Sequence, residues 1–243
     1  MENIIEIKKL NFGYKDKMIF ENFNLNIKKN SFTTIIGPSG SGKNTLAKLL
    51  LEKNNTNSIS FNGSKSIFHV FYDERKKGRV IDEICNKLKI EKPLVEKIGK
   101  KLKIEEILYK KINELSIDER QYISLIEAFV LKPEVIILNT TLGYLDHFNK
   151  EKILKILKKI NATIIHITND VEDILIGNHV IILNSGKLVF NDKTETILIN
   201  KKTLKSVNLD NPFMINLSER LKLYELINKT YYKKEELVDA LWK

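Results

Sequence analysis

The chain of 243 residues has little of what marks secreted or membrane-spanning proteins. Its one cysteine, Cys85, excludes an internal disulfide and is typical of proteins in a reducing compartment. No apolar run approaches the roughly 18 residues that a membrane-spanning helix needs, and the opening MENIIEIKKL does not resemble a signal peptide. We therefore expect a soluble, cytoplasmic protein, for which any role at a membrane requires a partner.

Arginine is also scarce, since only four of the 41 basic residues are arginine. With 31 acidic residues, the formal net charge is +10. Such a balance can attract nucleic acid or an anionic membrane surface. The lysines are spread along the chain, however, and recur together with asparagine and isoleucine, which is typical of an AT-rich genome. We therefore interpret them as solvated faces and predict no direct binding to nucleic acid.

Apolar residues make up 42% of the chain and fall into strand and helix patterns. Short runs rich in β-branched residues predict buried strands, and apolar residues at helical spacing predict helices between them. This alternation predicts an α/β fold with a parallel sheet and helices on both faces. We expect strands at 4–7, 23–27, 32–36, 58–70 (short strands about an Asn62-Gly63 hairpin turn), 135–138, 163–168 and 180–183, and helices at 44–52, 80–111 (with breaks near Pro93 and Gly99), 116–131 and 150–160.

The end of the chain differs from the rest. We expect a main domain of residues 1–200 and a small helical extension of residues 201–243. Asn211-Pro212 is a good helix start, because proline suits the first turn of a helix. The apolar stripes of the extension could pack on the main domain or on a partner subunit, and the sequence leaves both open. They consist of Phe213, Leu217 and Leu221, followed by Leu237, Val238, Leu241 and Trp242.

A glycine-rich loop follows the strand at 32–36 and precedes the helix at 44–52, as a phosphate-binding loop requires. Its glycines allow successive N–H groups to turn inward, and the helix N-terminus adds a partial positive charge. Lys43 is expected to reach the outer phosphates of a nucleotide. The candidate nucleotide-binding residues are Gly37, Pro38, Ser39, Gly40, Ser41, Gly42, Lys43, Asn44 and Thr45.

The residue after the lysine departs from the usual pattern. Serine or threonine normally stands there, and its hydroxyl binds Mg²⁺. This chain has Asn44 instead. An amide oxygen can bind Mg²⁺, but the ion demands near-ideal octahedral geometry. Asn44 is therefore a weak candidate for a metal ligand, and we expect Mg²⁺ binding to be weakened.

Gly37–Thr45 resembles the Walker A loop of ABC transporter ATPases, and the order of later segments fits that family along almost the full chain. Phe12-Gly13-Tyr14 resembles the adenine-stacking region, with Tyr14 as the ring. Residues 135–138 with Leu145-Asp146 resemble the Walker B strand and the D-loop. Thr168-Asn169-Asp170 stands where the family has Thr-His-Asp.

The C-terminal extension adds a narrower resemblance. Leu209–Phe213 and Glu235–Trp242 are similar to the extension of ATPase subunits from energy-coupling factor (ECF) vitamin transporters. The resemblance implies a P-loop NTPase fold of the ABC type, with antiparallel and helical subdomains beside the parallel sheet. It also implies ATP and Mg²⁺ as cofactors, a second ABC ATPase subunit as heterodimer partner, and a transmembrane subunit. Such a subunit lies on the inner face of the cell membrane, dimerises partly through its extension, and couples dimer closure to uptake of a vitamin or a cation.

The residues that hydrolyse ATP in this family are largely replaced. The Walker B strand of the family ends in Asp and Glu, which support Mg²⁺ and polarise the attacking water, but here these are Asn139 and Thr140. The switch His is Asn169, and the Q-loop Gln is Tyr72. Loss of a general base typically costs roughly 10²- to 10⁴-fold in rate. His166 precedes Asn169 by three residues, and we interpret it as a strand side chain.

The signature motif of the family, Leu-Ser-Gly-Gly-Gln, is also altered. Its glycines let the loop approach a γ-phosphate bound to the opposite subunit. Asp118 and Glu119 place negative charge at a helix N-terminus, where an anion would otherwise bind. Ser116 and Glu119 have the spacing of a capping box, so we predict that the helix keeps its cap and loses its ligand. The altered motif is Leu115, Ser116, Ile117, Asp118 and Glu119.

These replacements favour a non-catalytic or weakly catalytic ATP-binding subunit. Three alternatives stay open. The chain could be an ordinary transport ATPase in which Asp146 or Asp170 takes over, although both have simpler interpretations as D-loop and helix-start residues. It could be a soluble P-loop regulator or nucleic-acid-associated ABC protein, or a decaying paralogue without a selected function.

Overall fold

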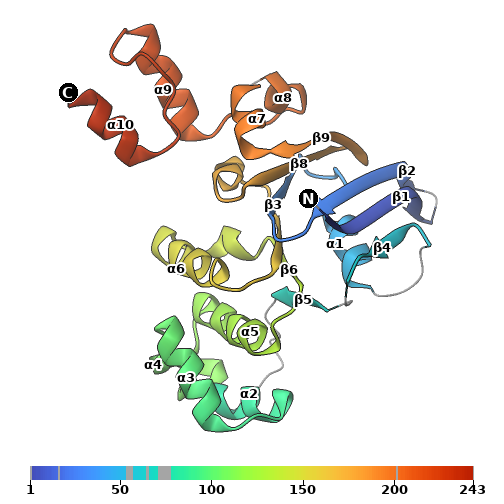
Figure 1. Ribbon diagram of the computed structural model, residues 1–243, viewed down its shortest axis with the longest axis vertical. Helices are drawn as coiled ribbons and strands as arrows, with labels where there is room; N and C mark the ends of the chain where they lie inside the picture. The colour runs from blue at the N-terminus through green and yellow to red at the C-terminus, as the bar shows by residue number, and fades with distance from the viewer. Residues whose placement is uncertain are drawn as a thin grey trace.

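The structure is a computed structural model that describes residues 2–15, 17–52, 57–63, 66–70, 78–200 and 202–242. A six-stranded sheet in the order β5-β6-β7-β3-β8-β9 forms its centre (Figure 1). The first five strands in that order are parallel, and β9 is antiparallel to β8, which confirms the predicted parallel sheet. The strands are β3 (Phe32–Ile36), β5 (Ile67–Val70), β6 (Val135–Asn139), β7 (Thr163–Ile167), β8 (His179–Asn184) and β9 (Lys187–Lys193).

Both faces of the central sheet are covered. In β6, Ile136 and Leu138 belong to a core cluster shared with α5 (Ile117–Leu131) and α6 (His147–Leu157). Val135 and Ile137 belong instead to a cluster shared with α1 (Lys43–Leu51) and the N-terminal strands. Alternate residues therefore serve opposite faces, and this is why the parallel strands are continuous apolar runs in the sequence.

A smaller antiparallel sheet in the order β2-β1-β4 carries the N-terminus. It is formed by β1 (Asn3–Tyr14), β2 (Lys17–Lys28) and β4 (Ile59–Phe61). The predicted hairpin about Asn62-Gly63 is wrong, because β4 pairs with β1 whereas β5 pairs with β6 in the other sheet. The turn-forming residues lie in a connection between the two sheets, and a local turn signal does not specify which partner the next strand takes.

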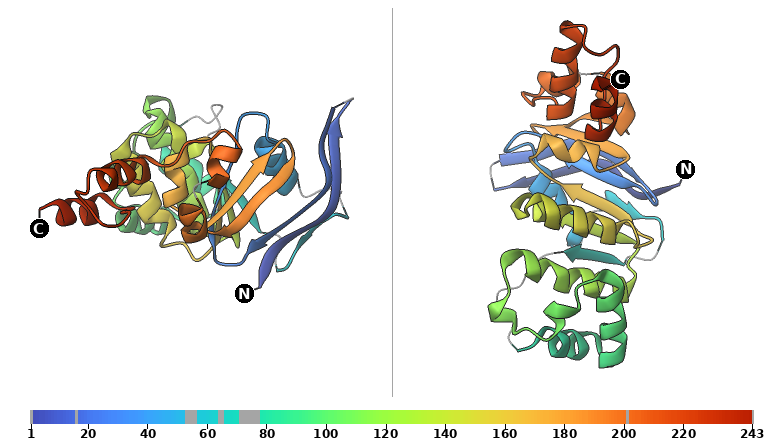
Figure 2. Two further views of the ribbon diagram at one scale, coloured as in Figure 1. Left: turned by 90° about the horizontal axis from the view of Figure 1, so that it is seen from above. Right: turned by 90° about the vertical axis from the view of Figure 1, so that its left-hand side faces the viewer.

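A helical subdomain lies at the end of the molecule opposite to the C-terminus (Figure 1, Figure 2). It contains α2 (Val80–Leu88), α3 (Lys92–Leu102), α4 (Glu105–Leu108) and the short η1 (Ile112–Glu114). Pro93 lies in the first turn of α3, which begins at Lys92, as expected from the predicted break. The predicted break at Gly99 is wrong, since this glycine lies buried within α3. A Cβ there would approach Leu108 Cδ1 to 2.6 Å, so Gly99 serves close packing of α3 on α4.

Several short helices connect the larger elements. The turns η2 (Thr141–Tyr144) and η3 (Val171–Leu175) follow β6 and β7, and α7 (Thr194–Ile199) and α8 (Lys202–Ser206) follow β9. The sequence patterns did not predict β9, α7 or α8. Within the described part of the chain, no helix combines the length and the apolar character needed to cross a bilayer.

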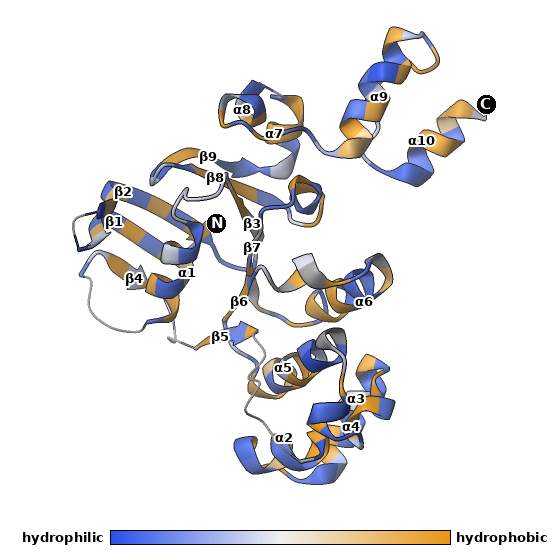
Figure 3. Cartoon of the chain, turned by 180° about the vertical axis from the view of Figure 1, so that it is seen from behind, coloured by the Kyte–Doolittle hydropathy of each residue, from blue (hydrophilic) through white to orange (hydrophobic). Residues whose placement is uncertain are grey.

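The extension ends in α9 (Phe213–Leu223) and α10 (Lys234–Leu241), which project beyond the rest of the chain (Figure 1, Figure 2). Ile215 of α9 is fully buried in a third core cluster with Ile174 and Ile182. The predicted stripe is therefore only partly right, because Phe213 is exposed. Figure 3 shows apolar residues along both α9 and α10. At the C-terminal ends of these helices, Leu223 and Trp242 are 82% and 86% exposed.

We expect Ile215→Ala to loosen the extension. Deleting this buried side chain leaves a cavity, and the docking of α9 should weaken by roughly 2–4 kcal/mol. Limited proteolysis within residues 201–212 should then become faster, while the thermal unfolding of the main domain changes little. Leu223→Ala on the exposed side of the same helix is the matched control and should leave the cleavage rate unchanged. Equal cleavage of both variants would contradict the docking role of Ile215.

Candidate functional site

The glycine-rich loop lies at the carboxyl end of β3 and leads directly into α1. In parallel α/β sheets, ligands bind at this edge. Gly40 and Gly42 have φ angles of 78° and 100°, in the left-handed region that favours glycine. Since Gly42 stands at the N-cap position of α1 and has no side chain, it does not cap the first N–H groups of that helix. This arrangement is suited to an anion such as phosphate.

Neighbouring backbone segments approach the loop closely. A Cβ on Gly37 would lie 2.0 Å from the carbonyl oxygen of Leu183 in β8. The N–H of Gly186, in the turn between β8 and β9, donates to the carbonyl of Ser41 at 3.1 Å. A Cβ on Gly186 would itself lie 1.7 Å from the carbonyl oxygen of Ile19. Sequence reasoning missed Gly186, although the Ser185-Gly186 pair between two apolar runs is a turn signal.

Lys43 points back into the loop. Its Nζ donates to the carbonyls of Gly37 and Pro38 at 2.6 and 3.0 Å, and contacts the Ser41 hydroxyl at 3.2 Å. The side chain is buried, and this burial lowers the pKa of its ammonium group. A phosphate in the loop would offer the ammonium a charged partner in place of these neutral carbonyls.

The other predicted nucleotide-binding residues flank the loop. Tyr14 ends β1 and is 46% exposed, with its ring edge-on to Phe12 at 5.2 Å between centroids. Its ring is therefore partly accessible to a planar group. Asn44 is exposed in the first turn of α1, and Thr45 is half-buried beside it.

The end of β6 carries Asn139 and Thr140. Thr140 has a φ of 54°, which is unusual for a β-branched residue. Its hydroxyl donates to the Asn139 carbonyl at 2.7 Å, and its N–H donates to the Ile167 carbonyl at 2.8 Å. The hydroxyl is thus turned onto its own backbone. Neither side chain offers a carboxylate to a metal ion or to a water molecule.

The N-terminus of α5 is capped by its own residues. The Ser116 hydroxyl accepts from the Glu119 N–H at 3.1 Å, and a Glu119 carboxylate oxygen accepts from the Ser116 N–H at 3.0 Å. The predicted capping box is confirmed. Partial burial raises the pKa of Glu119, but hydrogen bonds from Lys110 and from the Ser116 N–H outweigh this and lower it. The side chains of Ile117 and Asp118 lie outside the described residues.

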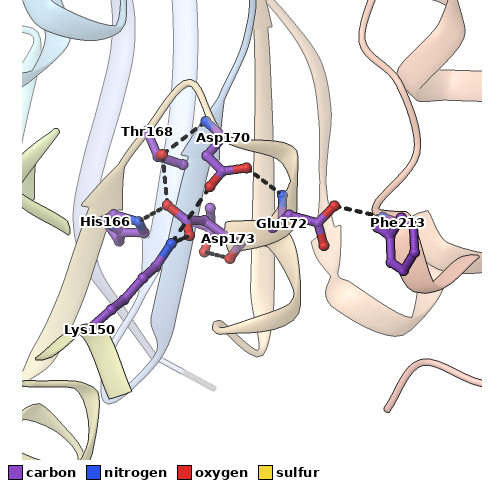
Figure 4. Close-up of polar contacts among 8 residues, drawn as sticks. Lys150, His166, Thr168, Asp170, Glu172, Asp173 and Phe213 are labelled. Carbon is purple, nitrogen blue, oxygen red and sulfur yellow. Dashed lines mark hydrogen bonds and ion pairs between the residues drawn. The ribbon is translucent and has the colours of Figure 1, made fainter. Parts of the chain in front are cut away.

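A buried polar network follows β7 (Figure 4). His166 Nε2 and the Thr168 hydroxyl each lie 2.7 Å from one oxygen of Asp173. Lys150 of α6 forms an ion pair with the other oxygen of Asp173 and a second one, at 3.6 Å, with Asp170. His166 is a fully buried strand side chain, as predicted. Sequence reasoning missed the pairing of Lys150 in α6 with Asp173, and the only signal for Asp173 is a charge among the apolar residues of η3.

The switch position itself, Asn169, is exposed at the end of β7, directly before this network. Asp170 caps η3 by accepting from the Glu172 N–H at 3.0 Å. Asp146 likewise caps α6, accepting from the Asn149 N–H at 2.9 Å. Asp170 is therefore a helix-start residue, as interpreted from the sequence, and Asp146, interpreted there as a D-loop residue, also caps a helix.

Comparison with known proteins decides the family. A family model for ABC transporters matches residues 20–141, about half of the chain. The energy-coupling factor transporter ATP-binding protein EcfA1 of Ligilactobacillus salivarius is 30% identical over 98% of this chain and 95% of its own length. The chain belongs to the ABC transporter ATPase family. EcfA of Pediococcus pentosaceus is also 30% identical, over 91% of this chain and 90% of the relative.

Solved structures agree on the fold of this ABC ATPase. CbiO1 from Clostridium perfringens, described as part of the ABC transporter complex cbiONQ, superposes with a TM-score of 0.73 at 23% identity. The match covers 93% of this chain and all of that one. A putative metal-chelate type ABC transporter in an inward-facing conformation gives a TM-score of 0.72 at 21% identity, over 86% of this chain and 89% of that chain. These likenesses support the P-loop ABC fold alone.

The site of this ABC ATPase fits a nucleotide better than it fits a metal ion. The loop Gly37–Gly42 and the helix N-terminus suit phosphates. In the resemblance to ABC ATPases, two of the positions that would bind Mg²⁺ hold the neutral amides of Asn44 and Asn139, whereas Mg²⁺ prefers carboxylates with phosphates. Among the described residues, no group of three or more His, Cys, Asp and Glu could hold a metal ion. Tyr72, the predicted Q-loop position, lies outside the described residues.

Two glycine variants should separate crowding from backbone strain in the loop. Gly37→Ala forces a methyl group against the Leu183 carbonyl and should destabilise the fold by roughly 3 kcal/mol or more. A Cβ on Gly40 would meet nothing within 4 Å, so Gly40→Ala should cost only about 1 kcal/mol, from its left-handed φ. Urea unfolding measures both free energies, and a cost that is equal for the two variants would refute the close approach.

The stability that the Asp173 network contributes to the fold should depend on pH. Burial raises the pKa of Asp173, but the hydrogen bond and charge of His166, with Lys150 and Thr168, outweigh this and lower it from 3.8 to about 2. A lowered pKa means that the folded state favours the carboxylate. Its contribution, about 2 kcal/mol, is therefore complete above about pH 4 and is lost as the pH falls toward about 2.

The free energy of unfolding of the unmodified chain minus that of Asp173→Asn should shrink by about 2 kcal/mol between about pH 5 and about pH 2. Urea unfolding at several pH values measures this difference. The exposed Asp239→Asn is the control, for which the difference should stay nearly constant. A difference for Asp173→Asn that does not change with pH would contradict the network.

Proposed function

We propose that this chain is an ATP-binding subunit of an energy-coupling factor type transporter that binds nucleotide but hydrolyses it weakly or not at all by itself. One observation carries the proposal. The phosphate loop has left-handed glycines at positions 40 and 42, and the Lys43 ammonium turns back into it. The positions that would do the chemistry, Asn139, Thr140 and Asn169, have no carboxylate and no imidazole. The ECF names of the curated relatives support the transporter type.

The chemistry follows from the replaced groups. Asn139 has a shape similar to aspartate but lacks the charge that would hold Mg²⁺, and Asn44 offers only an amide oxygen. Thr140 cannot accept a proton near neutral pH, and its hydroxyl is engaged with the Asn139 carbonyl. Loss of the base alone lowers the rate roughly 10²- to 10⁴-fold. Metal binding should be weakened as well, so the bound nucleotide acts mainly as a ligand.

A partner subunit is part of the proposal. ABC ATPases form composite sites from the Walker A loop of one chain and the signature of the other. The N-terminus of the signature helix α5 is occupied by the Ser116–Glu119 capping box, and Lys110 forms an ion pair with Glu119 at 2.6 Å. The composite site on the partner's Walker A loop would then lack the signature residues that approach the γ-phosphate. We infer a heterodimer in which nucleotide-driven closure, with slow hydrolysis on the partner's side, supports uptake of a vitamin or a cation.

The place of the subunit follows from the same reasoning. It would lie in the cytoplasm, on the inner face of the membrane, and bind a transmembrane subunit. The extension, residues 201–243, is a candidate for part of the dimer interface, because Leu223, Tyr224 and Trp242 expose large apolar side chains on it.

An active ATPase with a relocated base has less support. Asp146 and Asp170 are the available carboxylates near the D-loop and the switch segment, and each already accepts a backbone N–H as a helix cap. Asp170 also lies 3.6 Å from the Lys150 ammonium. Both groups therefore serve local structure.

Titration with a nucleotide analogue tests the proposal. The unmodified chain should bind the analogue, and Lys43→Ala should weaken binding by about tenfold or more, because a charged contact with phosphate is lost. Adding Mg²⁺ should change the affinity by less than about threefold, since the metal ligands are neutral. Lys48→Ala, an exposed lysine of the same helix, is the matched control and should bind normally.

Three results would overturn the proposal in different ways. Tight binding that depends strongly on Mg²⁺ would mean that Asn44 and Asn139, or other groups, still hold the ion. Robust hydrolysis by the purified homodimer, abolished by Lys43→Ala, would make the chain an ordinary transport ATPase. Absence of any binding would remove the nucleotide-binding role.

A further inference from the structure

The C-terminal extension is attached to the switch segment by a carboxylate. Glu172, in η3, accepts a hydrogen bond from the backbone N–H of Phe213 at 2.6 Å, although 41 residues separate the two (Figure 4). Phe213 is the first residue of α9. A carboxylate at a helix N-terminus is favourable, because it meets both an N–H without an intrahelical partner and the positive end of the helix dipole.

The segment that carries Glu172 is also fixed to the strand that carries the phosphate loop. The Thr168 N–H donates to the carbonyl of Ile35 at 3.1 Å, and Ile35 lies two residues before Gly37. The Thr34 hydroxyl donates to the carbonyl of Asp173 at 3.2 Å. Two hydrogen bonds therefore join β3 to residues 168–173. A shift of β3 or of the phosphate loop would be transmitted to η3.

The same segment also forms ion pairs with α6 and packs against the hydrophobic core. Lys150 forms ion pairs with Asp170 and with the fully buried Asp173. Ile174 shares a core cluster with Ile215, which lies two residues after Phe213 in α9. The first turn of α9 thus has an apolar attachment at Ile215 and a polar one at Glu172, both to residues that follow the switch position Asn169 directly.

We propose that Glu172 is a positioning residue that couples the switch segment to the C-terminal extension, so that nucleotide in the phosphate loop and docking of α9 favour each other. The proposal rests on the proposed nucleotide binding and adds a regulation of the same site. By linkage, if nucleotide tightens the docking of α9 by some factor, the docked extension raises nucleotide affinity by the same factor. Glu172 acts through the backbone of residues 168–173 and does not touch the nucleotide.

Hydrogen exchange on the full chain tests the coupling. Exchange of the amides at Phe213–Arg220 is followed with and without a non-hydrolysable ATP analogue at saturating concentration, in the unmodified chain, Glu172→Ala and Glu172→Gln. Glu195→Gln, an exposed glutamate of α7, is the matched control. The analogue should slow exchange in the unmodified chain and in Glu195→Gln by about fivefold or more, which is the lower end of typical coupling between two sites.

The readout distinguishes coupling from simple structural support. A merely structural role would speed exchange in Glu172→Ala equally with and without the analogue. Coupling requires in addition that the effect of the analogue disappear in Glu172→Ala and be reduced in Glu172→Gln, which keeps an acceptor oxygen but loses the charge. If the analogue slows exchange less in Glu172→Gln than in the unmodified chain, the affinity of Glu172→Gln for the analogue should be lower by the ratio of the two effects. This measurement tests the coupling even if Glu172→Ala does not fold.

Failure of this proposal is distinct from failure of the proposed function. If the analogue binds but leaves the exchange of α9 unchanged, or slows it by the same factor in all variants, the coupling through Glu172 is refuted and nucleotide binding stands. If the analogue does not bind the unmodified chain, both are refuted.

Discussion

The position of β3 between β7 and β8 is the constraint on which the site depends. Parallel pairing on both sides brings three chain segments to one edge of the sheet, namely the phosphate loop after β3, the switch segment after β7 and the turn after β8. The contact of Gly37 with Leu183 and the bond from Gly186 to Ser41 both follow from this placement. So does the bond from Thr168 to Ile35. The same ladder therefore shapes the loop and links it to the rest of the site.

Much of this arrangement could be predicted from the sequence, because its cause is local. A parallel strand buried on both faces is a continuous apolar run, and a phosphate loop is a contiguous motif. The failures have nonlocal causes. Asn62-Gly63 indicates a turn, but it does not specify with which strand the next strand pairs. Gly99 allows close packing against Leu108, which lies on another helix. Lys150 and Asp173 lie 23 residues apart, with no periodicity to connect them. The buried face of α9 depends on Ile174, which no helical spacing reveals.

Residues that support the backbone near the site can be distinguished from residues that would support catalysis. Several residues support the backbone, since Ser116 and Glu119 cap α5, and Asp146 and Asp170 cap α6 and η3. In the resemblance to ABC ATPases, Asn139, Thr140 and Asn169 stand at the positions that would bind Mg²⁺ and activate water, and none of the three caps a helix by a described side-chain hydrogen bond. Asparagine at position 139 is similar in shape to aspartate, so the strand end is undisturbed. In the proposed function, the side chains that support the backbone at these positions are therefore different from those that would support catalysis.

The contacts of Lys43 have a consequence for how a ligand would enter. Because its ammonium already bonds the carbonyls of Gly37 and Pro38, the conformation of the loop is set during folding and not by the ligand. When a ligand binds, the Lys43 ammonium exchanges these carbonyls for the ligand. Because the six residues Gly37–Gly42 are already ordered, binding avoids most of the cost in conformational entropy of ordering them. Affinity in such a preorganised loop is sensitive to the sheet beneath it. A substitution that loosens β3 against β8 would act as a remote mutation of the ligand site, without touching any atom that the ligand meets.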